Sequence, residues 1–355
     1  MRKIRVLVVD DSSFNRKIIS EILESSEKIE VVGKAFDGED AISKILKVQP
    51  EAITLDLEMP RMDGFAVLRW VMANYPVPVI VVSARESDRS VFKALDLGAV
   101  DFVVKPSRHA SPQLKEIERE LLAKILSIPS LQFDVVRQRL AKTAPPPAPV
   151  ALPVAQGGRT AEVVAIAAST GGPPAIQQIL QGLHPALASP ILVCQHMPPI
   201  FTRLFAERLG ALTGRAVKEA EDGEALRPAH VYIAPGGKQL RLRLKEGVKR
   251  LSVDERKPED RFAPCANHLL TSVAAVCGRH CLVAVLTGMG DDGKEGSVAI
   301  HEAGGTVVAE SEASAVIFGM PREVIKAGAA DHVTDIPGVV ALVNRYAVMR
   351  SGFGP

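Results

Sequence analysis

The first part of the chain alternates short apolar runs with longer stretches in which apolar residues recur every three or four positions. Short apolar runs are typical of buried parallel strands, and a three-to-four spacing is typical of helices. The pattern predicts helices at residues 13–23 and 38–48, and strands at residues 5–9, 31–36, 52–55, 79–82 and 102–104. Strands and helices that alternate in this way predict a doubly wound (βα)5 domain around a parallel sheet.

The alternation stops near residue 128 and resumes near residue 161. The stretch from Lys142 to Ala161 is rich in Pro and Ala, which is typical of a semi-extended linker, and a short helix is predicted just before it at 131–140. The second part of the chain is predicted to have strands at 163–168, 191–194, 230–234 and 282–286, a hairpin at 240–244 and 249–253, and helices at 202–212 and 265–276.

This pattern predicts three regions. We expect a first domain at residues 1–127, a linker at 128–160 and a second domain at 161–355. The second domain should also be a doubly wound, mostly parallel α/β domain, with a β-hairpin insert.

The predicted strands of the first domain end at polar residues, which are Asp10, Asp11, Asp56, Ser83 and Lys105. The carboxyl ends of parallel strands lie at one edge of a sheet, where three carboxylates repel one another unless a cation joins them. Oxygen ligands of this kind suit Mg²⁺, and a Lys and a hydroxyl beside them suit the oxygens of a phosphoryl group. Taken singly, Asp11 could cap a helix and Lys105 could be a solvated side chain. Five polar residues at successive strand ends favour a shared site.

Polar residues also follow three predicted strands of the second domain. Ser169 follows the first strand, His196 follows the next one, and Asp291 and Asp292 follow a later one. If these strands are parallel neighbours, a nucleophile, a base and an acid meet at one edge, as hydrolysis through an activated serine requires. The simpler interpretation is that Ser169 only caps the helix after it.

The glycine pair after Ser169 could also suggest a nucleotide site. Gly171 and Gly172 are adjacent, however, and neither the GxGxxG nor the P-loop pattern is present. Pro173 and Pro174 lack the backbone N–H groups that would bind an anion at a helix start. The sequence therefore argues against dinucleotide binding.

Composition and charge narrow the class of protein. Hydrophobic residues make up 47% and charged residues 24% of the 355 residues, as in ordinary globular proteins. The net charge of +2 arises in the linker, because both predicted domains have nearly equal numbers of acidic and basic residues. Neither has the basic excess of a nucleic-acid-binding domain. No apolar run reaches the ~20 residues of a membrane helix, and the four cysteines show no zinc spacing, so we expect a cytoplasmic protein with reduced thiols.

The first domain resembles the receiver domains of response regulators. The resemblance is carried by Asp10-Asp11, by DLEMPRMDG from Asp56, by Ser83-Ala84 and by GAVDFVVKP from Gly98. It implies that a histidine kinase phosphorylates Asp56, that Mg²⁺ binds there, and that the peptide bond before Pro106 is cis. It also implies the following roles: metal binding by Asp10, Asp11 and Asp56, phosphoryl sensing by Ser83 and Lys105, and a mobile switch aromatic at Phe102.

The whole chain resembles the chemotaxis-type protein-glutamate methylesterases. The motifs are AASTGG at 167–172, CQHMP at 194–198, HVYIAPGG at 230–237, LTGMGDDG at 286–293 and FGMP at 318–321. The resemblance implies hydrolysis of glutamate methyl esters on the cytoplasmic helices of chemoreceptors, deamidation of glutamines there, and no cofactor for the esterase. It implies these roles: nucleophile Ser169, general base and acid His196, orienting carboxylate Asp292, and oxyanion donors at the backbone N–H groups of Thr170 and Met289.

The sequence departs from the family pattern at several positions. The family usually has Gly at Ala167 and Asn at Asp291, so two adjacent acids compete here for the orienting role. Residues 263–267 read APCAN where the family more often has RPSVD. We expect an esterase controlled by phosphorylation of the receiver. The alternative is a receiver-gated binding module without hydrolytic activity.

Overall fold

The computed structural model describes residues 2–83, 88–105, 112–141 and 160–349. The chain divides into two compact units, residues 1–143 and 144–355. Ala84 and Pro106 lie outside the described residues, as does most of the predicted linker. No helix in the described ranges is long and apolar enough to cross a membrane.

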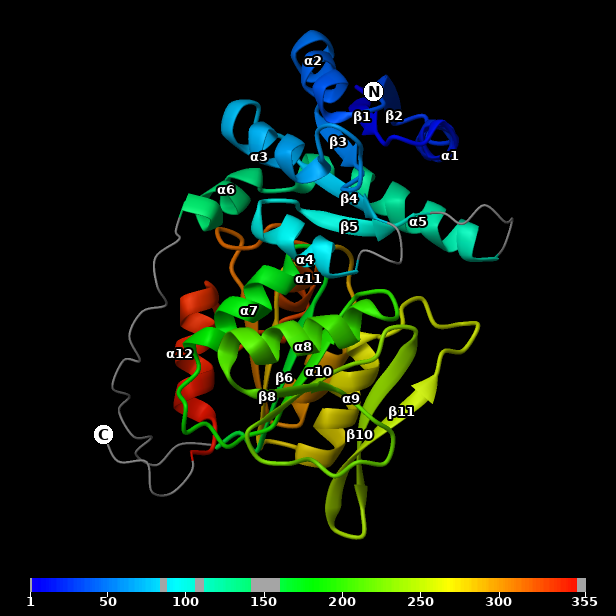
Figure 1. Ribbon diagram of the computed structural model, residues 1–355. Coiled ribbons are helices and arrows are strands. Elements are labelled where there is room, and N and C mark those ends of the chain that lie inside the picture. Colours follow the sequence, from blue (N-terminus) through cyan, green and yellow to red (C-terminus); the bar gives the residue numbers. More distant parts are fainter. Residues whose placement is uncertain (1, 84–87, 106–111, 142–159, 350–355) are drawn as a thin grey trace. The chain divides into compact units, whose positions relative to one another are not determined.

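The first unit is built on a five-stranded parallel sheet (Figure 1, blue to cyan). Its strands are β1 Ile4–Val9, β2 Ile29–Ala35, β3 Ala52–Leu55, β4 Val79–Ser83 and β5 Asp101–Val104, and its helices are α1 Ser13–Glu24, α2 Gly38–Val48, α3 Gly64–Asn74, α4 Asp88–Asp96 and α5 Pro112–Leu126. The strand order is β2-β1-β3-β4-β5. The strands are almost entirely buried, as their apolar sequences predicted.

Folded structure continues into the segment that we expected to be linker. A short 3₁₀ turn, η2 (Ile128–Ser130), is followed by helix α6 (Phe133–Ala141). Val135 and Val136 of α6 are buried, and Leu140 lies against Gly98 in the loop before β5. An amphipathic helix buries its apolar side wherever a partner surface is near, so α6 packs on the first unit.

The second unit contains fifteen elements in the described residues (Figure 1, green to red). The strands are β6 Val163–Ala168, β7 Ile191–Gln195, β8 Ala216–Glu219, β9 His230–Ile233, β10 Lys238–Lys245, β11 Val248–Glu255, β12 Cys281–Val285, β13 Thr306–Glu310 and β14 His332–Thr334. The helices are α7 Gly172–Gly182, α8 Phe201–Thr213, α9 Ala266–Cys277, α10 Lys294–Glu302, α11 Met320–Lys326 and α12 Ile336–Tyr346.

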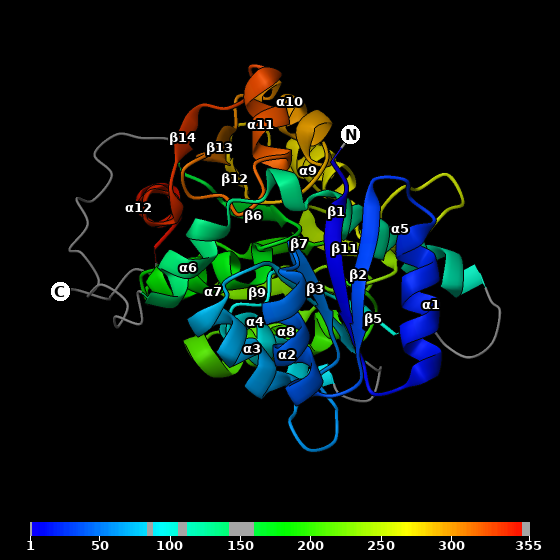
Figure 2. The same cartoon turned by 90° about the horizontal axis from the view of Figure 1, so that it is seen from above.

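Seven of these strands form one parallel sheet in the order β14-β13-β12-β6-β7-β9-β8, and Figure 2 shows most of this succession from above. The pair β10–β11 forms a separate antiparallel hairpin. Both observations confirm the predicted mostly parallel α/β fold with a hairpin insert. Strand β6 lies between β7 and β12, and the chain order reverses around it. Open α/β sheets place their chemistry at such a reversal, outside the carboxyl ends of the strands.

Candidate active site

Ser169 lies in the turn between β6 and α7, beside the ends of both neighbouring strands. Its backbone N–H donates to the carbonyl of Thr287 after β12 (3.0 Å), and its carbonyl accepts from Gly172 (2.8 Å). Helix α7 is capped by Gly171 without a side-chain hydrogen bond. Gly171 has a φ of 77°, and a Cβ there would lie 2.7 Å from Val316. Ser169 is therefore not the helix cap, and the simpler interpretation of this serine is wrong.

His196 and Asp292 are in direct contact. The His196 Nε2 atom lies 2.7 Å from Asp292 Oδ2, and both side chains are largely buried. The backbone N–H of His196 donates to the carbonyl of Ala168, the residue before Ser169 (3.0 Å). The ends of β6, β7 and β12 thus bring Ser169, His196 and Asp292 to one edge of the sheet.

Asp292 is held at the start of helix α9. Its carboxylate accepts backbone N–H groups from Ala266 (2.7 Å) and Asn267 (2.9 Å), and the Cys265 thiol donates to Oδ1 (3.2 Å). Burial alone would raise the pKa of Asp292, but the hydrogen bonds and charge of His196 and these N–H groups lower it to about 2. The side chain is therefore an anion at neutral pH.

This charge determines which nitrogen of His196 can act as a base. An ionised carboxylate only accepts hydrogen bonds, so the Nε2 atom beside Asp292 must carry a proton. In neutral His196 the second nitrogen, Nδ1, then has the free lone pair. Within the described residues no hydrogen bond joins Ser169 Oγ to His196. Such bonds are often long before substrate is bound.

The two adjacent acids after β12 have different partners. Asp292 contacts His196, whereas Asp291 is exposed and forms an ion pair with Arg261 (3.0 Å). Cys265 stands where the family more often has Ser, and its thiol still donates to Asp292. Burial and the negative charge of Asp292 raise the pKa of this thiol to about 12, so it stays protonated.

The backbone positions predicted as oxyanion donors lie in two adjoining turns. Thr170 is buried directly after Ser169, and its carbonyl accepts the Thr287 hydroxyl (2.9 Å). Met289 is half-buried after Gly288, and a Cβ at Gly288 would lie 2.8 Å from the Ser169 Cβ. The two turns therefore meet at the serine.

Gln195 and Phe262 were missed from the sequence. The buried amide of Gln195 donates to the carbonyls of Ser169 (2.9 Å) and His196 (3.0 Å), so it joins the two turns. A polar residue that ends a buried apolar strand was a usable signal for Gln195. The Phe262 ring stacks on the His196 ring, with centroids 4.5 Å apart. Nothing in the loop sequence indicated that contact.

The acidic edge of the first unit is also assembled. Single carboxylate oxygens of Asp10, Asp11 and Asp56 lie within 4.8 Å of one another. The Lys105 ammonium lies 2.5 Å from Asp56 and 3.1 Å from Asp10 and is mostly buried, so it is not a solvated side chain. Ser12, rather than Asp11, caps helix α1.

These three carboxylates suit a divalent cation. Burial raises the pKa of Asp56 to about 6, although Lys105 acts in the opposite direction. Asp10 Oδ2 is buried and accepts no hydrogen bond from the described residues. Hard oxygen donors with an unsatisfied buried oxygen fit Mg²⁺. The residues predicted to sense a phosphoryl group are both buried, Ser83 at the end of β4 and Phe102 on β5, where the Lys124 ammonium lies 5.4 Å from the Phe102 ring centre.

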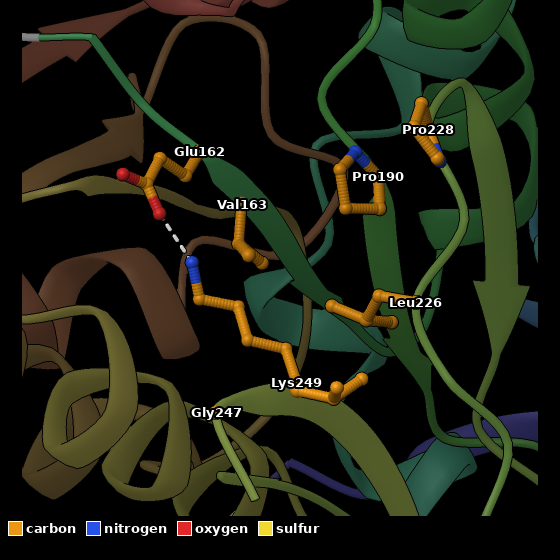
Figure 3. A pocket seen from close by; sticks show the side chains of 8 residues that line it. Glu162, Val163, Pro190, Leu226, Pro228, Gly247 and Lys249 are labelled. Atoms are coloured by element: carbon orange, nitrogen blue, oxygen red, sulfur yellow. Dashed lines mark hydrogen bonds and ion pairs between the residues drawn. The ribbon is translucent and has the colours of Figure 1, made fainter.

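A cavity of about 380 Å³ lies in the second unit, away from this chemistry (Figure 3). It is lined by residues near the starts of β6 and β7, including Val163 and Pro190, and by the hairpin residues Gly247 and Lys249. Glu162 and Lys249 form an ion pair across it. Since Ser169 and His196 follow the opposite ends of the same strands, this cavity is not part of the candidate active site.

A five-stranded parallel domain with an acidic edge, joined to a second α/β domain, defines the chain as a response regulator with an α/β effector domain. The sequence profile of the response regulator receiver domain matches residues 6–116. The profile of the CheB methylesterase matches residues 164–343. The chain belongs to the CheB methylesterase family.

Relatives and a solved structure agree with this assignment. The chain is 43% identical to protein-glutamate methylesterase/protein-glutamine glutaminase 1 of Myxococcus xanthus, over 96% of this chain and 98% of the relative. It is 44% identical to the third such protein of Geobacter sulfurreducens, over 99% and 98%. The CheB methylesterase catalytic domain of Thermotoga maritima matches with a TM-score of 0.50 and 37% identity, and covers 52% of this chain and 99% of that domain.

Proposed function

We propose that this protein hydrolyses glutamate methyl esters, and deamidates glutamines, on the cytoplasmic helices of chemoreceptors. The observation that carries the proposal is the His196–Asp292 hydrogen bond at the sheet edge where Ser169 stands. The named activity of the relatives supports the reaction and its substrates. The alternative, a binding module without hydrolytic activity, gives no reason for a buried His-Asp pair beside a serine.

The geometry supports acyl transfer through Ser169. Its Oγ atom attacks the ester carbonyl carbon while its proton passes to Nδ1 of His196. Asp292 keeps Nε2 protonated and stabilises the imidazolium. The Thr170 and Met289 N–H groups stabilise the oxyanion of the intermediate. The bond to the methoxy oxygen then breaks, and methanol leaves with the proton from His196. Water, activated by His196, cleaves the acyl-enzyme to a glutamate carboxylate; with glutamine, ammonia is the first product to leave.

The receiver would control this reaction. A histidine kinase phosphorylates Asp56, and Asp10, Asp11 and Asp56 hold Mg²⁺, which neutralises charge on the phosphoryl oxygens when bound. Lys105 and Ser83 bind those oxygens, and the new charge shifts Phe102 and the loop after Ser83 into a second arrangement. The unphosphorylated receiver inhibits the catalytic domain, so that phosphorylation links receptor output to demethylation and thus to sensory adaptation.

The test is release of methanol from receptor fragments methylated on glutamate. Ser169→Ala and His196→Ala should each reduce the rate by about 10³-fold or more, and the double variant should lose little more, because such residues act as a unit. A fluorophosphonate probe should label Ser169 in the wild-type chain. Strictly additive losses would reject the catalytic assignment, and an unlabelled, inactive wild-type chain would favour the binding module.

A further inference from the structure

The hydrogen bond to Asp292 does not by itself fix the plane of the His196 ring. One contact at Nε2 (2.7 Å) sets the position of that atom, but the ring can still tilt about the line that joins the two side chains. Tilting would swing Nδ1 away from Ser169. Proton transfer needs the donor and acceptor within about 2.6–3.2 Å, so a second contact on the ring is required.

Phe262 provides a contact on the face of the ring. The Phe262 and His196 rings are stacked with an angle of 15° between their planes and centroids 4.5 Å apart. Aromatic pairs at this separation attract one another beyond their buried area. Contact over a face opposes tilting, which contact at the Nε2 edge cannot do.

Phe262 is itself held in place from two sides. Its carbonyl accepts a hydrogen bond from the buried amide of Gln239 (2.7 Å), which also accepts the N–H of Cys265 (2.9 Å). The Arg261 guanidinium lies 5.0 Å from the centre of the Phe262 ring and pairs with Asp291. A buried anchor thus fixes the backbone of the loop, and an ion pair at the surface covers its aromatic side chain.

We propose that Phe262 is a positioning residue that holds the imidazole plane of His196, and that Arg261 and Asp291 support it. This inference rests on the proposed function and assigns separate roles to the two adjacent acids. Asp292 orients the ring at its edge. Asp291 acts through Arg261 on the aromatic side chain that orients the face.

The experiment uses the full chain with Phe262→Leu and Phe262→Tyr. Leu keeps an apolar side chain but has no ring to stack, and Tyr keeps the ring. Phe262→Leu should lower kcat for methanol release by about three- to tenfold, leave KM within about twofold, and slow fluorophosphonate labelling of Ser169 to a similar degree. Phe262→Tyr should restore both rates. Ring-proton NMR signals of His196 should move in the Leu variant and stay near their wild-type positions in the Tyr variant.

The matched control is Tyr346→Leu, which removes the aromatic partner of another imidazole, His332, at a centroid distance of 6.4 Å. Its kcat should equal that of the wild type. An active wild-type chain with an equally active Phe262→Leu variant would overturn the positioning role alone. A rise in KM at constant kcat would replace it with substrate binding. A wild-type chain that neither releases methanol nor labels at Ser169 would reject the proposed function, and this inference with it.

Discussion

Two buried carboxyl groups of this protein show how neighbouring groups decide the charge of a side chain. Burial raises the pKa of both Asp56 and Asp292, because water no longer solvates the anion. Asp292 accepts several N–H groups and an imidazole, so its pKa falls to about 2, whereas Asp56 has Lys105 and one backbone N–H, and its pKa stays at about 6. The first group is suited to permanent charge and the second to gaining a new ligand.

For the acid pair we expect unequal losses. Asp292→Asn should lower turnover by about 10³-fold or more, because an amide that donates to Nε2 leaves the proton on Nδ1, where the base is needed. Asp291→Asn should stay within about threefold of wild type, since Asp291 acts only through Arg261. Steady-state methanol release from methylated receptor fragments measures both. A larger loss in Asp291→Asn would transfer the orienting role to that residue.

Magnesium binding should depend on pH through Asp56. With a pKa of about 6, the carboxyl is protonated at lower pH, and a cation must displace that proton. Affinity should therefore fall by up to about tenfold per pH unit below pH 6 and level off above it. Calorimetric titration of the full chain with MgCl₂ at pH 5 and pH 7.5 measures this. In Asp56→Asn the pH dependence should be smaller, and equal affinities of the wild type at both pH values would contradict the role of this group.

At the scale of elements, the turn from β6 to α7 depends on the closeness of two backbones. Gly172 begins α7, and a Cβ there would lie 2.1 Å from Gln195 Oε1 and 2.7 Å from the Ala168 Cβ. Real side chains do not approach so closely. Any larger residue must therefore displace Gln195, whose amide joins the carbonyls of Ser169 and His196.

Gly172→Ala should consequently reduce activity more than stability. We expect a loss of about tenfold or more in kcat with a decrease in Tm of a few degrees, because the shift separates the catalytic turns while the core strands stay packed. The matched control is Gly210→Ala in α8, where a Cβ would meet no atom closer than 3.6 Å. The control should keep full activity. Equal kcat in both variants would show that the Gln195 contact does not matter for catalysis.

The elements that the sequence predicted share one property, which is a buried, regular apolar pattern. Strands such as Ala52–Leu55 and helices such as Gly38–Val48 have the predicted bounds, because period and burial agree. Strand β8, with the sequence AVKE at a sheet edge, was missed because it is half-exposed and charged. Phe262 was missed for a different reason. Its partner lies 66 positions earlier in the chain, and local patterns contain no information on such contacts.

At the scale of the whole molecule, the chain joins a receiver and an esterase through a segment rich in Pro and Ala. A tether of this kind keeps two domains at high effective concentration, so that even a weak inhibitory interaction is populated. Phosphorylation adds roughly two negative charges at Asp56. A weak interaction is easily reversed by a change of that size, which a tight interface would resist.

The corresponding prediction compares three forms of the protein. A fragment of residues 161–355 should release methanol faster than the unphosphorylated full chain, because it lacks the inhibiting receiver. Acetyl phosphate with Mg²⁺ should raise the full-length rate towards that of the fragment, and Asp56→Asn should prevent the rise because it removes the acceptor oxygen. The Asp56→Asn chain without phosphodonor serves as the control for basal activity. A fragment slower than the unphosphorylated chain would reject inhibition, and would mean that the receiver instead helps the esterase to engage its substrate.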